Sequence, residues 1–220
     1  MWLGLDDPKL YTAHRSAGGM TSIYRQIGIA CERVFREILQ DALGLSAEQV
    51  VWSYEAPLSD GKRRRLSLDG RVALDEVQEE PSRDRLRRWI RDAADSVDVD
   101  ASIVGSLKGV VFEVRQGYKS KDSKRQQADL ANAVAAYTSG YLPCLLVLSH
   151  QIDSDVLLRY RAARWVALTG EFSGGSPLAS TYELMAGIIG YDLAGFFARH
   201  SDTLRSEVGN VLSTLLGSDE

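Results

Sequence analysis

Apolar residues recur with two different periods along the chain, and each period predicts a different kind of element. Residues 21–44 carry apolar side chains every three or four positions, as on one side of an amphipathic helix. Gly44 is a suitable residue to end this helix. Residues 1–20 lack this period and include Gly18-Gly19, so we expect an irregular N-terminal stretch followed by a helix.

Later segments fall into the same two classes. Alternating or continuously apolar runs predict strands at 50–58, 62–77, 109–116, 142–149 and 165–172. Helical spacing predicts helices at 82–97, 121–141, 153–165 and across most of 177–217. A turn signal, Ser59-Asp60-Gly61, lies between the first two strands, so 50–75 is expected to form a hairpin or a meander.

The order of these elements predicts an α/β fold. A strand, a helix and an apolar strand follow one another within 110–149, which is the pattern of a β-α-β unit. We therefore expect a mixed β-sheet flanked by helices within residues 1–173. The sequence Gly-Gly-Ser-Pro at 174–177 predicts a boundary, after which residues 174–220 would form a C-terminal helical subdomain packed on the core.

Composition agrees with a globular domain. The 220 residues are 45% hydrophobic and 25% charged, and this length can bury a core without disulfides. The two cysteines, Cys31 and Cys144, lie among apolar residues and are expected to be reduced core thiols. The N-terminus lacks a signal-peptide pattern, and no window is apolar enough for a membrane span, so we expect a cytoplasmic protein without membrane contact.

Charge is distributed unevenly along the chain. The net charge of −4 argues against a general nucleic-acid binder. However, residues 115–125 contain five bases and one acid, whereas residues 170–220 contain seven acids and two bases. A protein with this asymmetry can present a local phosphate-binding face although its overall charge is negative.

The segment GVVFEVRQ contains the first candidate for chemistry. Its alternation places Val111, Glu113 and Arg115 on one face of a strand. A carboxylate on a central strand is unfavourable unless a cation accompanies it. The partner of Glu113 is therefore expected to be either a divalent metal ion or a buried arginine, and Arg115 lies on the same face.

Hydrolysis of a phosphodiester explains this combination of residue types. Mg²⁺ offsets the phosphate charge and lowers the pKa of the attacking water, and it needs carboxylate ligands. A second acid should therefore come from an earlier strand. Asp69 in LSLDGRV is the first choice, and Asp98 and Asp100 are alternatives with shorter separations from Glu113. Glu32 on the first helix is either an additional acid or a solvated partner of Arg36.

Residues 65–75 and 109–149, including GVVFEVRQGYKSKDSKRQ, the following Ala-rich helix and LPCLLVLS, resemble the core of type II restriction endonucleases in the PD-(D/E)XK nuclease superfamily. The resemblance implies Mg²⁺-dependent cleavage of double-stranded DNA by a homodimer. Asp69 and Glu113 would then be the metal ligands. The third motif position falls on Arg115, where the family has lysine, and an arginine cannot act as a base. Lys119 or Lys121 could reach back to supply the missing amine.

The basic segment after this strand predicts contacts to DNA. It opens a helix, where free N–H groups favour phosphate. The candidate phosphate ligands are Lys119, Lys121, Lys124 and Arg125, and Gln126 could reach the active site or a base edge.

Two further basic clusters, 62–65 and the arginines of 82–97, could also contact phosphates. Three alternatives to a restriction enzyme stay open: a repair or junction-resolving nuclease, a non-catalytic DNA-binding protein, and a structural protein in which Glu113 and Arg115 form only an ion pair.

Overall fold

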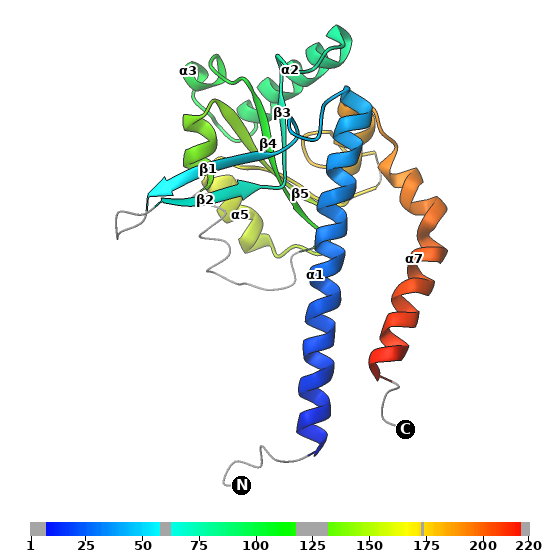
Figure 1. The fold of residues 1–220 in the computed structure, drawn as a ribbon. Helices are drawn as coiled ribbons and strands as arrows, with labels where there is room; N and C mark the ends of the chain where they lie inside the picture. The colour runs from blue at the N-terminus through cyan, green and yellow to red at the C-terminus, as the bar shows by residue number, and fades with distance from the viewer. Residues whose placement is uncertain (1–7, 58–62, 118–131, 173, 217–220) are drawn as a thin grey trace. The chain divides into compact units, whose positions relative to one another are not determined.

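The computed structural model describes residues 8–57, 63–117, 132–172 and 174–216 (Figure 1). The chain forms two compact units. One unit contains Cys31–Leu193 with both sheets, and the other contains the remaining helical residues of the two ends. The units therefore divide the chain differently from the boundary expected at residue 174, because residues 174–193 belong to the same unit as the sheets.

The elements of Figure 1 have the following bounds. The strands are β1 (Trp52–Pro57), β2 (Arg63–Leu68), β3 (Gly70–Ala73), β4 (Gly109–Arg115), β5 (Tyr141–Val147) and β6 (Val166–Leu168). The helices are α1 (Pro8–Leu43), α2 (Glu80–Asp95), α3 (Ala101–Val104), a helical segment at 132–138, α5 (Ser154–Ala162), α6 (Thr181–Glu183), the π-helix η1 (Leu184–Ile189) and α7 (Leu193–Leu216).

The central sheet has the order β3-β4-β5-β6 and is mixed. β3 is antiparallel to β4, whereas β4, β5 and β6 are parallel. The helical segment 132–138 lies in the connection between β4 and β5, as expected for a β-α-β unit. The mixed sheet flanked by helices is thus confirmed.

The expected strand at 62–77 was wrong in one respect, because it divides at Asp69. β2 pairs with β1 in a separate two-stranded ribbon, in the register Trp52↔Leu68, while β3 joins the central sheet. Asp69 is therefore at the point where the chain passes from one sheet to the other. β3 pairs with β4 although α2 and α3 intervene in the sequence.

The first helix is longer than expected. α1 begins at Pro8, so the irregular stretch expected at 1–20 was wrong for its described part. Gly18 lies within the helix, and a Cβ added to it would meet no atom within 4 Å outside the neighbouring helix backbone. A glycine lowers helix stability by about 1 kcal/mol but ends a helix only where the backbone turns left-handed. Gly44 does turn left-handed, with φ of 66°, and it follows the last helical residue as expected.

Different helices cover the two faces of β4. Phe112 meets Phe35 of α1 edge-to-face, with ring centroids 5.1 Å apart. On the opposite face, Val111 belongs to a buried cluster with Ala136 of segment 132–138 and Tyr160 of α5. Glu113 follows Val111 by two residues and so belongs to this second face.

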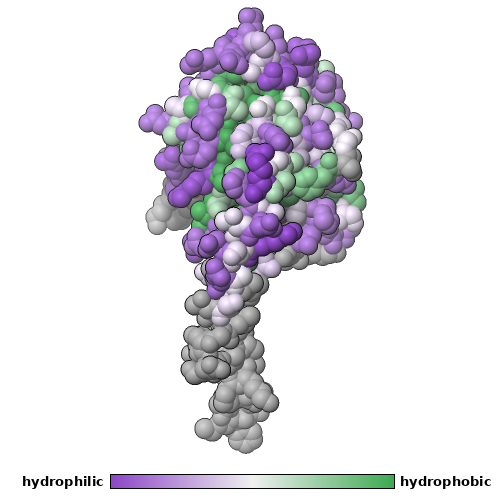
Figure 2. Space-filling model, turned by 90° about the vertical axis from the view of Figure 1, so that its right-hand side faces the viewer, coloured by the Kyte–Doolittle hydropathy of each residue, from purple (hydrophilic) through white to green (hydrophobic). Residues whose placement is uncertain are grey.

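The surface of the protein is largely polar on the side drawn in Figure 2, where hydrophilic residues surround smaller areas of hydrophobic ones. Within the described part of the chain, every helix is too short or too polar to span a bilayer. Cys31 and Cys144 are both unpaired with another cysteine, and Cys144 is buried as expected.

Candidate functional site

Glu113 lies near the C-terminal end of the central strand β4 and is almost fully buried, with 5% of its surface exposed. Its carboxylate forms an ion pair with the guanidinium of Arg115, whose side chain is 12% exposed. The strand period of two brings these side chains to the same face. The sequence offered a metal ion or an arginine as the partner of Glu113, and in the protein alone Arg115 takes that place.

Asp69 reaches the same strand from the neighbouring one. It directly precedes β3, whose Gly70 pairs with Phe112, and its backbone N–H donates to the Phe112 carbonyl over 2.8 Å. Its carboxylate oxygen Oδ2 accepts a hydrogen bond of 2.8 Å from the backbone N–H of Val114. The structure therefore brings the carboxylate of Asp69 against the backbone between Glu113 and Arg115.

Helix α1 contributes two charged residues to this region. Glu32 and Arg36 are four residues apart and so lie on one side of the helix. The Arg36 guanidinium donates to the backbone carbonyl of Asp69 over 3.4 Å. Glu32 is half-buried and acts electrostatically on the Asp69 carboxyl group. Sequence patterns did not indicate that Arg36 would contact Asp69, and they suggested only a pair between Arg36 and Glu32.

The surroundings of Asp69 disfavour its ionised form. Its pKa is raised from 3.8 to about 6, chiefly because the carboxyl group is buried and also because of the negative charge of Glu32. The hydrogen bond from Val114 and the positive charges of Arg115 and Arg36 act in the opposite direction. The net result is a carboxyl group that would gain from a nearby cation.

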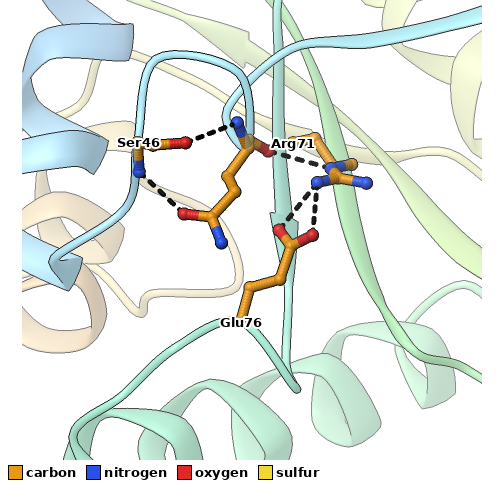
Figure 3. Close-up of polar contacts among 4 residues, drawn as sticks. Ser46, Arg71 and Glu76 are labelled. Atoms are coloured by element: carbon orange, nitrogen blue, oxygen red, sulfur yellow. Dashed lines mark hydrogen bonds and ion pairs between the residues drawn. The ribbon is translucent and has the colours of Figure 1, made fainter.

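The strand that begins beside Asp69 is fixed by a polar network (Figure 3). The Arg71 guanidinium donates to the backbone carbonyl of Gln49 over 2.9 Å and to both carboxylate oxygens of Glu76 over 2.7 Å. Gln49 and Ser46 in turn exchange two backbone–side-chain hydrogen bonds. In the part of the chain that the structure describes, β3 is an edge strand of the sheet, and this network gives it polar contacts beyond those to β4.

The donor set around β4 suits Mg²⁺ in type. Among the described residues, no group of three or more His, Cys, Asp or Glu side chains is close enough to hold a metal ion. Mg²⁺ does not require such a group, since it usually binds through one or two carboxylates together with waters and substrate phosphates. Asp69, which directly precedes β3, and Glu113 on the neighbouring strand β4 are two carboxylates that could hold such an ion.

The two alternative acids are engaged elsewhere. Asp100 caps α3 by accepting from the backbone N–H of Ser102 over 2.8 Å. Asp98 has a side chain that is 93% exposed, and its carboxylate lies 3.9 Å from the Arg164 guanidinium. Both residues come before the N-terminal end of β4, whereas Glu113 lies near its C-terminal end. Of these three acids, Asp69 is the one whose carboxylate the structure places against the β4 backbone beside Glu113.

The expected basic residues after β4 lie outside the described part of the chain: Lys119, Lys121, Lys124, Arg125 and Gln126. Their predicted contacts to DNA therefore stay predictions. The backbone N–H of Val114, which sequence patterns cannot identify, is the additional group that the structure places at the site.

Comparisons with models of protein families, with curated proteins and with solved structures find no match for this chain.

Proposed function

We propose that this protein is a Mg²⁺-dependent endonuclease that cleaves double-stranded DNA at specific sequences, built on a restriction-endonuclease-like core. The observation that carries the proposal is the arrangement at β4: the Asp69 carboxylate lies against the backbone of Val114, next to Glu113 and Arg115. Two carboxylates that can bind Mg²⁺ and one cation that stabilises charge on the phosphate are the side chains that metal-dependent hydrolysis of a phosphodiester uses.

Each residue has a separate role in this proposal. Asp69 and Glu113 would hold Mg²⁺, which supplies an activated water and offsets the charge of the phosphate. Arg115 stabilises negative charge that develops on the phosphate, and it stays protonated throughout. Burial keeps these charges in a medium where their interactions are stronger than in water. Lys119 is proposed as the amine that assists the water. A homodimer would supply one such site for each DNA strand.

A second candidate is favoured by the ion pair of Glu113 and Arg115. This pair satisfies the buried carboxylate without a metal ion, as in a non-catalytic DNA-binding protein on the same fold. Such a protein would bind DNA with a steep salt dependence and would leave it intact.

Incubation of the purified protein with a panel of plasmid and phage DNAs tests the proposal. Parallel reactions contain Mg²⁺ or EDTA and are read on a gel. Discrete bands that require Mg²⁺ are expected for a sequence-specific endonuclease. Intact DNA with Mg²⁺, Mn²⁺ and Co²⁺ would contradict the proposal, and binding without cleavage would favour the second candidate.

A further inference from the structure

The β1–β2 ribbon has an inner and an outer face with opposite character. Trp52 and Leu68 point inward into the buried cluster beside β4. Tyr54, also on this face, donates from its hydroxyl group to Oδ1 of the buried Asn132 over 2.5 Å. These contacts fix the inner face to the body of the unit, so the outer face is presented by a supported ribbon (Figure 1).

The outer face carries alternate residues of both strands. Those whose side chains the structure describes are polar, and they are Ser53, Glu55, Arg63, Arg65 and Ser67.

The two arginines of this outer face are exposed and weakly held. Arg63 pairs with Glu55 over 2.9 Å, and their side chains are 74% and 58% exposed. Arg65 donates from Nε to the Ser53 hydroxyl group over 3.0 Å. An exposed pair of this kind contributes at most about 1 kcal/mol, so an incoming phosphate can displace the present partner.

The direction of β2 connects these arginines with the candidate site. β2 runs from Arg63 toward Leu68, and Asp69 follows it directly. At about 3.3 Å per residue, Arg65 and Arg63 lie about 13 and 20 Å along the strand from Asp69. Since DNA rises about 3.4 Å per base pair, these distances span about four and six base pairs. A two-stranded ribbon also has the width that the major groove admits.

The arginines of α2, the other basic cluster of the sequence, mostly make contacts within the protein. Arg83 donates to the Val77 carbonyl over 2.9 and 2.8 Å. Arg85 donates to the Ile188 carbonyl over 3.2 Å and is half-buried. These side chains fix α2 to its neighbours. The structure therefore separates two basic clusters that the sequence could not rank.

We propose that the outer face of the β1–β2 ribbon is a second DNA-contact surface, on which Arg63 and Arg65 bind backbone phosphates about four to six base pairs from the bond that is cut. This inference rests on the proposed function, since it extends the path of the duplex outward from Asp69. In this proposal the ribbon contributes to the affinity for DNA and takes no part in the cleavage reaction.

The test measures binding of a fluorescent 30-base-pair duplex without divalent cations, by anisotropy, between 50 and 200 mM salt. Each phosphate contact contributes about 0.9 to the slope of log K against log salt concentration. The double variant Arg63→Ala/Arg65→Ala should therefore lose about 1.8 from this slope. Circular dichroism should show an unchanged fold, because both side chains are exposed.

The matched control is Arg87→Ala, which removes an exposed arginine that pairs with Asp84 one helical turn away on α2. Its slope should equal that of the wild type. The inference is overturned if the double variant keeps the wild-type slope, or if Arg87→Ala lowers the slope as much per arginine. If either result is found but the wild-type protein still cleaves DNA with Mg²⁺, the proposed nuclease function is not contradicted. A wild type that neither binds nor cleaves DNA would overturn both.

Discussion

Replacement of Asp69 by asparagine should stabilise the protein at neutral pH, although Asp69 is a candidate metal ligand. The amide can still accept the hydrogen bond from the backbone N–H of Val114, so the change removes mainly the ionisation. The pKa of Asp69 rises from 3.8 to about 6 on folding, chiefly because the carboxyl group is buried. Since a tenfold change in an ionisation constant is worth about 1.4 kcal/mol, the penalty for ionised Asp69 reaches about 3 kcal/mol.

The sign of the pH dependence follows from the raised pKa. The folded protein binds the Asp69 proton more tightly than the unfolded chain does. The resulting stabilisation is complete below about pH 4 and is lost as the pH rises through about 6. Asp69→Asn should therefore differ little from the wild type at pH 4 and should exceed its free energy of unfolding by up to about 3 kcal/mol at pH 7.5.

Urea unfolding at pH 4, 5, 6 and 7.5 measures this difference without divalent cations, and the fluorescence of the buried Trp52, Trp89 and Trp165 reports on the transition. The exposed Asp75 provides a control, because Asp75→Asn removes the same charge from the surface. A difference between Asp69→Asn and the wild type that stays constant from pH 4 to 7.5 would refute the reasoning.

Other substitutions test the contacts around the site by the same unfolding assay. Glu113→Gln should lower the free energy of unfolding by about 3–5 kcal/mol, because it leaves Arg115 without its charged partner. The double variant Glu113→Gln/Arg115→Met should lose less stability than the sum of the two single variants. Additive losses would contradict a buried ion pair. Arg71→Ala should cost about 1–3 kcal/mol through its lost hydrogen bonds, and a loss under 0.5 kcal/mol would show that the network contributes little. Gly109→Ala should lower the free energy of unfolding by at least about 1–3 kcal/mol, because the added Cβ would collide with the β3 backbone. Gly28→Ala should be neutral or stabilising, because the added Cβ lies in open space within α1. Equal effects of the two substitutions on stability would contradict this reasoning.

Local patterns in the sequence predicted the elements of the central sheet well. The period of two placed Glu113 and Arg115 on one face, and both side chains lie there. The pattern could not show that Asp69 separates two strands of different sheets, because the pairing of β3 with β4 closes a long loop through α2. The pairing of two strands depends on side-chain packing between residues that are far apart in the sequence, and not on the local pattern of either strand.

The choice among the candidate acids shows the same limit. Sequence separation favoured Asp98 and Asp100, whereas the strand-like pattern around Asp69 made it the first choice. The antiparallel pairing of β3 and β4 brings the Asp69 carboxylate to the β4 backbone beside Glu113. The contact from Arg36 to the Asp69 carbonyl was equally invisible, since it joins a helix and a strand end 33 residues apart.

The most direct test of the account compares cleavage of a supercoiled plasmid by the wild type, Asp69→Asn and Glu113→Gln, each with Mg²⁺ and with EDTA. Circular dichroism first establishes that all three proteins are folded at the assay temperature. We predict that the wild type cuts only with Mg²⁺ and that each variant loses at least about 100-fold in rate, as expected when a group that stabilises transition-state charge is removed. Wild-type rates in either folded variant would contradict the assignment of Asp69 and Glu113 as the metal-binding acids.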